Sequence, residues 1–383
     1  MENKTLNTSK IFWWLFALTT LFLAVSPLNN NGLNYLFRIP SLLLIVYMIV
    51  GLYGRIKNNC FWAVLTLSLI IIFHFIIDTD INFDIFLACF SVIAFLLLVI
   101  ISGGINVDDS LQKFVNKCSI ISAFVLIGYA LSPMSHLADY GGYIMQCPYL
   151  TYGFNNSNYA GIITFLVNSM IFITMESAGK KTKRLCYVLA IILIYLTYLT
   201  NTRSALVASL LIPISGFVFS RFKFSNRLLF LLCLVPFLFV PFYIKLGLSG
   251  NADGAQIMGK SIMSGRQEVY MEFIETLRSD WYWLFGNLSE NKFMNAHNGP
   301  LAIFVSVGVI GGLAFFFVVI SKLLYANRTA VTLQNKVAVF VILASLINTC
   351  GEAALLLGGF PGVTYLFAFF VFATSHRTES YGK

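Results

Sequence analysis

The 383-residue chain has little charge: only 11% of its residues are Asp, Glu, Lys or Arg, whereas 58% are hydrophobic. Soluble domains carry about 25% charged residues, so this composition excludes an ordinary soluble protein. The mean hydropathy of +0.82 leaves lipid as the solvent that fits most of the surface. The net charge of +9 then predicts no nucleic-acid partner, since membrane proteins concentrate Lys and Arg on the cytoplasmic side.

The chain also lacks the patterns that hold disulfides or metals. Its seven cysteines are scattered mostly through apolar runs, and none forms a C-x-x-C pair or lies beside His at ligand spacing. Residues 78–80 match D-x-D only as a short turn, to which we assign no metal. The first apolar run ends at Leu28 before three Asn rather than in small residues, so we read it as an uncleaved helix. No metal and no cofactor are predicted.

Apolar windows predict about twelve membrane helices, each near the roughly 20 residues that cross a bilayer core. Their approximate bounds are 11–28, 39–54, 60–77, 85–105, 118–133, 159–176, 185–201, 204–220, 228–248, 297–320, 337–356 and 363–375. All should be helical, because open strands cannot satisfy their backbone groups in lipid. The predicted fold is an all-α integral membrane protein that forms one polytopic domain over residues 1–383.

The basic residues test this arrangement. With the N-terminus inside, the predicted outer side holds only seven of the 25 Lys and Arg residues: Arg38, Arg203, Lys245, Lys260, Arg266, Arg278 and Lys292. This alternation follows the positive-inside rule, so both termini are expected in the cytoplasm. The largest outer loop is 249–296, between the ninth and tenth helices. Its stretch 265–285 repeats apolar residues every four positions, which predicts an amphipathic helix across the outer mouth of the bundle.

Two arginines are candidates for anion binding. Arg203 interrupts a long apolar run at a tight turn between two predicted helices. A guanidinium there either anchors a helix end at the interface or binds a phosphate bidentately. Arg266 begins the amphipathic helix, where a cation opposes the helix dipole, and this mild cost suggests an anionic partner. A solvated surface charge is the alternative for Arg266.

The candidate acid–base groups lie on the same predicted side. His297 stands where the outer loop enters the tenth helix, and histidine titrates near neutral pH, as a general base should. The alternative is a polar residue at a helix end. Glu352, near the outer end of the eleventh helix, is either functional or paired with an Arg. His74, inside the third helix, is predicted to be a satisfied histidine of the bundle.

An asparagine cluster precedes the sixth helix. Asn155, Asn156 and Asn158 stand among aromatic residues. Such a cluster forms a turn and a helix cap, or it donates hydrogen bonds to sugar hydroxyls. For any one of these residues, capping is the better interpretation.

Together these segments resemble the O-antigen polymerase and ligase superfamily of bacterial surface-polysaccharide enzymes. Three motifs carry the resemblance: the Thr-Arg-small-Ala-Leu element in 201–206, Ser-Gly-Arg at 264–266 before a Trp-containing helix and Leu-Phe-Gly at 284–286, and His297-Asn298 followed after nine residues by Gly308 and after two more by Gly311. The similar, catalytic region covers about residues 150–315.

The resemblance implies an enzyme of the inner membrane with its site at the periplasmic face. Its donor would be an oligosaccharide linked to undecaprenyl diphosphate, transferred to an acceptor hydroxyl with inversion and without metal. Arg203 and Arg266 would clamp the diphosphate, and His297 would accept the acceptor's proton. The implied substrate site also includes Asn155, Asn158, Asn298 and Glu352. Membrane lipid is a further partner, and a chain-length regulator and a flippase would be others.

Three functions remain open on these residues. A polymerase joins lipid-linked repeat units, and the short loops and Phe/Ile/Asn/Lys-rich composition favour it. A ligase moves finished chains to lipid A–core with the same donor motifs. A transporter or flippase would suit twelve helices with both ends inside, but predicts repeats and charges near mid-membrane.

Overall fold

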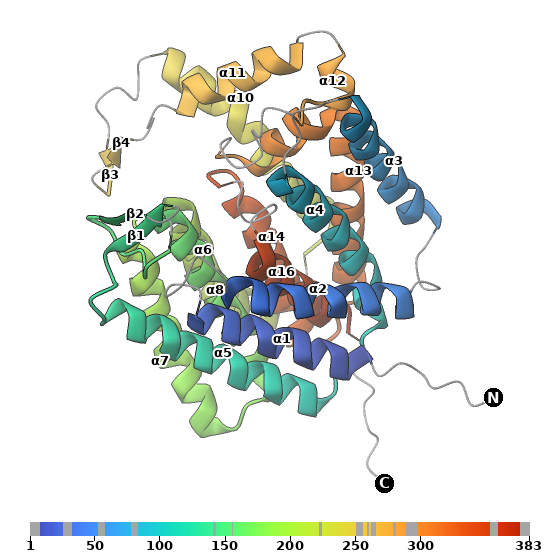
Figure 1. Ribbon diagram of the computed structural model, residues 1–383. Helices are drawn as coiled ribbons and strands as arrows, with labels where there is room; N and C mark the ends of the chain where they lie inside the picture. The colour runs from blue at the N-terminus through green and yellow to red at the C-terminus, as the bar shows by residue number, and fades with distance from the viewer. Residues whose placement is uncertain are drawn as a thin grey trace, which may run out of the picture.

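The computed structural model describes residues 8–25, 33–52, 58–77, 83–140, 143–154, 156–221, 224–249, 256–258, 260–261, 266–278, 281–288, 297–352 and 359–375. Over these residues the chain is a bundle of 15 α-helices with two small β-hairpins (Figure 1). The all-α prediction is therefore confirmed for the described part of the chain, apart from hairpins that the sequence did not predict.

The elements of the first half are α1 (Thr8–Val25), α2 (Leu33–Leu52), α3 (Asn58–Ile77), α4 (Phe83–Ile101), the 3-10 turn η3 (Ser102–Gly104), α5 (Asp109–Ala130), the hairpin β1 (Leu137–Tyr140) and β2 (Tyr143–Gln146), α6 (Ser157–Thr174), η4 (Met175–Ser177) and α7 (Lys180–Leu199). Those of the second half are α8 (Arg203–Arg221), α9 (Asn226–Cys233), α10 (Val235–Leu248), the hairpin β3 (Gln256–Ile257) and β4 (Lys260–Ser261), α11 (Arg266–Arg278), α12 (Tyr282–Phe285), α13 (Gly299–Thr329), α14 (Leu333–Asn348) and α16 (Gly359–Thr374).

Among the described residues, six helices are long and apolar enough to cross a membrane: α1, α3, α5, α6, α7 and α13. The pair α9 and α10, bent by 41°, makes a seventh if it counts as one span. The other five predicted windows coincide with shorter apolar helices: Ile39–Leu52, Cys89–Gly104, Arg203–Gly216, Leu333–Asn348 and Pro361–Thr374. Length and hydropathy thus support a multi-pass membrane protein with six or seven spans, and they do not confirm about twelve.

The core of the bundle is built on mostly apolar helices that are buried on every side. All residues of α6 from Ala160 to Thr174 are buried, and so are residues 361–374 of α16. A helix that is hydrophobic all round can be stable only inside a bundle or in lipid. Peripheral helices instead leave large apolar side chains outside, such as Ile76 of α3 and Ile191 of α7. These outward apolar faces are what a lipid environment accommodates.

The connections between helices segregate to two ends of the bundle. One end, the termini end, holds the start of α1 and the end of α16. There the Ser9 hydroxyl donates to the carbonyl of Asn106 at 2.8 Å, and the Asn335 amide of α14 donates to the carbonyl of Phe372 at 2.7 Å. Helix starts and ends that are far apart in sequence are thereby joined at one level of the bundle.

The other end, the pocket end, brings together further connections of the described residues. The Leu150 N–H donates to the carbonyl of Leu199 at 3.1 Å, and the Gly299 N–H donates to that of Thr349 at 2.9 Å. Figure 1 shows α11 and α12 covering this end at the top of the view, with the start of α1 in the lower part.

Gly308 divides α13, where the sequence predicted an uninterrupted span over 297–320. Its φ of +67° is not helical, so residues 299–307 and 309–329 are two helical pieces. A Cβ added at Gly308 would overlap the backbone at 284–285, and one at Gly286 would overlap the backbone at 306–307. The two glycines therefore allow a backbone-to-backbone contact between α12 and α13, which explains why the chain bends there.

The amphipathic helix predicted over 265–285 is correct in its faces but not in its length. Phe273 is buried and Val269 packs on the core, while Glu268 and Glu275 are exposed. However, α11 ends at Arg278 and a separate short helix, α12, follows. Between them the Trp281 ring packs against His74 of α3 at 5.7 Å. The contact with α3 thus gives the second part a different direction.

Candidate functional site

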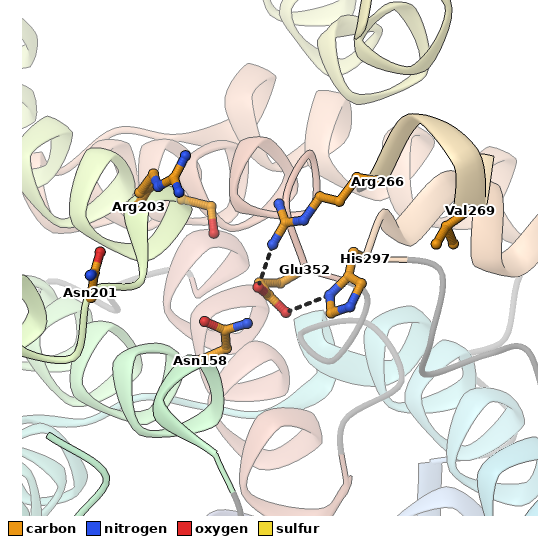
Figure 2. A pocket seen from close by; sticks show the side chains of 8 residues that line it. Asn158, Asn201, Arg203, Arg266, Val269, His297 and Glu352 are labelled. Carbon is orange, nitrogen blue, oxygen red and sulfur yellow. Dashed lines mark hydrogen bonds and ion pairs between the residues drawn. The ribbon is translucent and has the colours of Figure 1, made fainter. Parts of the chain in front are cut away.

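A cavity of about 280 Å³ opens at the pocket end. It is lined by Asn158, Asn201, Arg203, Ser204, Arg266, Val269, His297 and Glu352. Figure 2 shows Arg266 and His297 converging on Glu352, which lies between them, with Arg203 and Asn201 on the opposite side. Five residues singled out in the sequence therefore share one pocket, although they come from five separate segments.

Arg203 is placed by a tight turn between α7 and α8. Asn201 has a φ of +56°, a left-handed conformation that Asn tolerates better than most residues. The Thr202 hydroxyl donates to the carbonyl of Ser157 at 2.9 Å, which ties the turn to the start of α6. The Arg203 guanidinium donates to the carbonyl of Ser261 in β4 at 3.0 Å. The turn thus places Arg203 at the first residue of α8. The hairpin formed by β3 and β4 holds its guanidinium group.

A glycine of α6 makes room for that turn. A Cβ added at Gly161 would come within 2.7 Å of the Thr200 hydroxyl and would also press on the side chain of Thr202. Contacts under 3.0 Å require a neighbour to move, and both threonines are fully or nearly fully buried. The turn that carries Arg203 can therefore lie this close to α6 only because position 161 has no side chain.

His297 adopts a strained backbone conformation just before α13. Its φ is +47°, which is uncommon for a residue with a side chain. The phenol of Tyr270 in α11 donates to the His297 carbonyl at 3.1 Å. Burial raises the pKa of Tyr270, so the phenol remains a protonated donor throughout the neutral range. The hydrogen bond thus helps to maintain the strained backbone that places His297 at the pocket.

Glu352 is the one carboxylate among the residues that line the pocket, and it is 6% exposed. Its Oε1 lies 3.4 Å from Nη2 of Arg266, and its Oε2 lies 3.8 Å from Nδ1 of His297. The sequence left open whether Glu352 is functional or paired with an Arg, and the geometry shows the pairing. Because the carboxylate also faces the imidazole, it links the candidate anion site to the candidate base.

Four helices begin at the pocket. Asn158 is the second residue of α6, Arg203 and Ser204 are the first two of α8, Arg266 is the first of α11, and His297 stands two residues before α13. The first turn of a helix presents N–H groups that have no partner within the helix, and the positive end of its dipole, although Asn156 and Asn298 each cap one such N–H of α6 and α13. Four such ends together with two guanidiniums make this cavity attractive to a group with more than one negative charge.

Two other predicted site residues, Asn155 and Asn298, have different outcomes. Asn155 lies outside the described residues. Asn298 is fully buried and caps α13, since Leu301 N–H donates to its Oδ1 at 2.9 Å, and its amide nitrogen faces the carbonyls of Pro236 and Cys350. The structure does not bring Asn298 into the pocket lining, because its amide is used in holding helices together.

The histidine and asparagine predictions outside the pocket agree with the structure. His74 is 2% exposed, and its Nε2 lies 2.8 Å from the carbonyl of Phe285, as expected for a satisfied histidine of the bundle. Asn156 caps α6 by accepting from the N–H of Tyr159 at 2.7 Å. Capping is therefore the role of one member of the asparagine cluster.

The sequence predicts no site role for Asn201, Ser204, Val269 or Tyr270, although the first two lie in the motif over 201–206 and Val269 on the predicted apolar face. The last two follow Arg266 by three and four positions, so they lie on the same face of α11 and could have been found from helical spacing. Ser204 adjoins Arg203 and could also have been included. Asn201 carries no such signal, because its place depends on its left-handed conformation and on the Met258 carbonyl, to which its amide donates at 3.0 Å.

The fold and the pocket define a multi-pass helical membrane protein with a cationic cavity at one end of its bundle. Comparison with protein-family models, with curated proteins and with solved structures gives no match. The resemblance to O-antigen polymerases and ligases therefore depends on the motifs and on the residues that the pocket brings together.

Proposed function

We propose that this protein is a glycosyltransferase of the bacterial inner membrane, and specifically a polymerase of lipid-linked surface-polysaccharide repeats. The observation that carries the proposal is the shared cavity of Arg203, Arg266, His297 and Glu352. Two guanidiniums with four helix starts favour a diphosphate, and an imidazole beside them provides a base. The donor is a glycan on undecaprenyl diphosphate, and the acceptor is a hydroxyl of another lipid-linked repeat.

The proposal places about twelve spans in the membrane, with both termini in the cytoplasm and the pocket at the periplasmic face. The distribution of Lys supports it. Lys113 and Lys117 stand in the first turns of α5, and Lys180, Lys181 and Lys183 in the first turn of α7, both at the termini end. A concentration of Lys at one end is typical of the cytoplasmic side. The lipid tail of the donor then lies against the apolar flank of the bundle.

In the proposed reaction the acceptor oxygen attacks the anomeric carbon of the donor sugar. A new carbon–oxygen bond forms while the bond between that carbon and the diphosphate oxygen breaks, and the configuration inverts. His297 takes the proton of the acceptor hydroxyl. Undecaprenyl diphosphate leaves with the electron pair, and Arg203 and Arg266 stabilise its negative charge. These residues complete the transfer with no further reactant.

Substitutions at the pocket test the proposal. In a strain lacking the gene, His297→Ala should reduce polymer at least about 100-fold, the range for loss of a general base. Arg203→Lys should reduce it by a similar factor, because an ammonium cannot bind a diphosphate bidentately. The matched controls are His136→Ala and Arg278→Lys, exposed positions outside the pocket lining. Normal polymer from His297→Ala, at an equal membrane level of protein, would refute the assigned base.

The gel profile of the deletion strain separates the polymerase from the ligase. Loss of a polymerase leaves core carrying a single repeat, whereas loss of a ligase leaves bare core and accumulated lipid-linked polymer. A transporter would leave unmodified lipid-linked repeats on the cytoplasmic side of the membrane. A chain-length regulator and a flippase are the proposed protein partners of the polymerase.

A further inference from the structure

The position of Glu352 requires a reason beyond pairing with Arg266. Its side chain is 8% exposed, whereas those of Arg266 and His297 are 26% and 40% exposed. Removing a carboxylate from water costs free energy that only close partners recover. Charge-assisted hydrogen bonds are about 2.7–2.9 Å long. At 3.4 Å and 3.8 Å, Glu352 is held loosely by two partners rather than tightly by one.

Arg266 therefore has a weakly held anion on one side and space for another. Its Nη1 lies 3.4 Å from where a Cβ on Gly351 would be, so the absence of a side chain at 351 leaves the guanidinium room. Among the described residues, other ionisable groups that interact with Arg266 are Arg203, Tyr243 and Tyr270, and the rings of the two tyrosines are 5.6 Å apart. None of these three is an anion in the neutral range, so Glu352 is the negative charge that a bound phosphate would compete with.

His297 is held on two sides by the same group of residues. Tyr270 fixes its carbonyl at 3.1 Å, and Glu352 faces its Nδ1 at 3.8 Å. A carboxylate beside one ring nitrogen favours the tautomer with the proton on that nitrogen. The proton on Nδ1 leaves Nε2 as the nitrogen that accepts a proton from substrate. Full engagement of Glu352 with the ring also stabilises the imidazolium that forms.

We propose that Glu352 competes with the donor diphosphate for Arg266 and, when Arg266 turns to the phosphate, positions His297 through Nδ1 for proton abstraction. The inference rests on the proposed function and adds an order to it: donor binding precedes activation of the base. Glu352 is then a positioning residue, since it acts on the reaction through Arg266 and His297. An acceptor hydroxyl is deprotonated only when a donor is in place, which protects the site from unproductive attack.

The test is Glu352→Gln, which keeps the shape of the side chain and removes its charge. Binding of undecaprenyl diphosphate to the purified full-length variant in nanodiscs should be about 3- to 30-fold tighter than to wild type, because a like charge is gone. Polymer formed in cells should fall at least about 10-fold, because the imidazole loses its partner. Glu275→Gln, an exposed charge on α11, is the matched control and should change neither quantity.

Opposite changes in binding and transfer distinguish this role from a structural one. A misfolded variant, or a Glu352 that binds the sugar directly, loses binding and transfer together, and that result would overturn the inference while leaving the proposed function intact. Glu352→Asp keeps the charge on a shorter stem and should recover part of the transfer without the gain in binding. Wild-type protein that binds neither undecaprenyl diphosphate nor undecaprenyl phosphate would contradict the proposed function itself.

Discussion

At the scale of single residues, the pocket depends on side chains that never need to touch a substrate. Tyr270 is fully buried one turn into α11, and its phenol holds the carbonyl of His297. The positive φ of His297 is a conformation that the surrounding structure must maintain. The helix that presents Arg266 therefore also holds the candidate base. One element thus sets the positions of both Arg266 and His297.

Tyr270→Phe should weaken this arrangement. The substitution leaves a partly buried carbonyl without its donor, which should lower the free energy of unfolding by about 1–2 kcal/mol. Polymer formation should fall about 10-fold, while binding of undecaprenyl diphosphate changes little, because Arg203 and Arg266 remain. Thermal unfolding in detergent and the polymer yield measure the two effects.

Tyr198→Phe is the matched control, because Tyr198 is half exposed near the end of α7 and should tolerate the change. If Tyr270→Phe has full activity and stability, the hydrogen bond to His297 does not hold the residue in place.

At the scale of elements, the contact between α12 and α13 decides where the pocket-end half of α13 lies. Gly308 bends the helix, and Gly286 meets it backbone to backbone. The N–H of Asn287 adds a hydrogen bond to the carbonyl of Val305 at 2.7 Å. Because His297 stands two residues before the piece 299–307, the contact between α12 and α13 also fixes where His297 lies relative to the bundle.

Gly308→Ala should be strongly destabilising. A residue with a Cβ is strained at a φ of +67°, and the added atom also overlaps the backbone of α12. We expect a loss of about 2–5 kcal/mol from strain and overpacking together. The measurements are the melting temperature of the purified protein and its level in the membrane.

Gly128→Ala provides the matched comparison, since nothing lies within 4 Å of a Cβ added there in the last turn of α5. Ala is the better helix former, so this variant should be neutral or up to about 1 kcal/mol more stable. Equal behaviour of the two variants would show that the bend at Gly308 is not what holds α12 against α13.

Local patterns in the sequence were sufficient for the helices and for much of the pocket. The apolar faces of α11 and the candidates Arg203, Arg266, His297 and Glu352 could be found because each depends on its own surroundings in the chain. The bend at Gly308 could not, since the residues on both sides of it are apolar and have the composition of a continuous span. It arises only from contact with α12.

The role of Asn298 was equally hidden. Its amide nitrogen faces the carbonyls of Pro236 and Cys350, which lie more than fifty positions away in the chain. The strands of β3 and β4 are two residues long and carry no alternation to detect. Features that depend on distant partners, or on very short pairings, leave no periodic signal.

At the scale of the whole molecule, the two ends of the bundle can be assigned to sides of the membrane. Ile144 in β2 is 70% exposed near the pocket end, and Val331 between α13 and α14 is 81% exposed at the termini end. In a background with Cys60→Ser and Cys147→Ser, Ile144→Cys should react with a membrane-impermeant maleimide in cells whose outer membrane is permeabilised. Val331→Cys should react only after the inner membrane is broken.

The reverse pattern would place the pocket in the cytoplasm and would contradict a periplasmic transferase. Labelling of both positions while the inner membrane is intact would indicate that this membrane had leaked. The control is to measure the activity of a cytoplasmic enzyme in the medium, which should be absent. Because both cysteines replace exposed apolar residues on connections, neither substitution should disturb the core.

The hairpin formed by β3 and β4 meets the Arg203 turn through main-chain atoms. Asn201 donates to the carbonyl of Met258, and Arg203 donates to the carbonyl of Ser261. A carbonyl is the same whatever residue carries it, so the amino acids of this hairpin are free to diverge during evolution without disturbing the arginine. The surface that the hairpin presents beside Arg203 can therefore change with its side chains while the two contacts that hold the turn and the arginine stay the same.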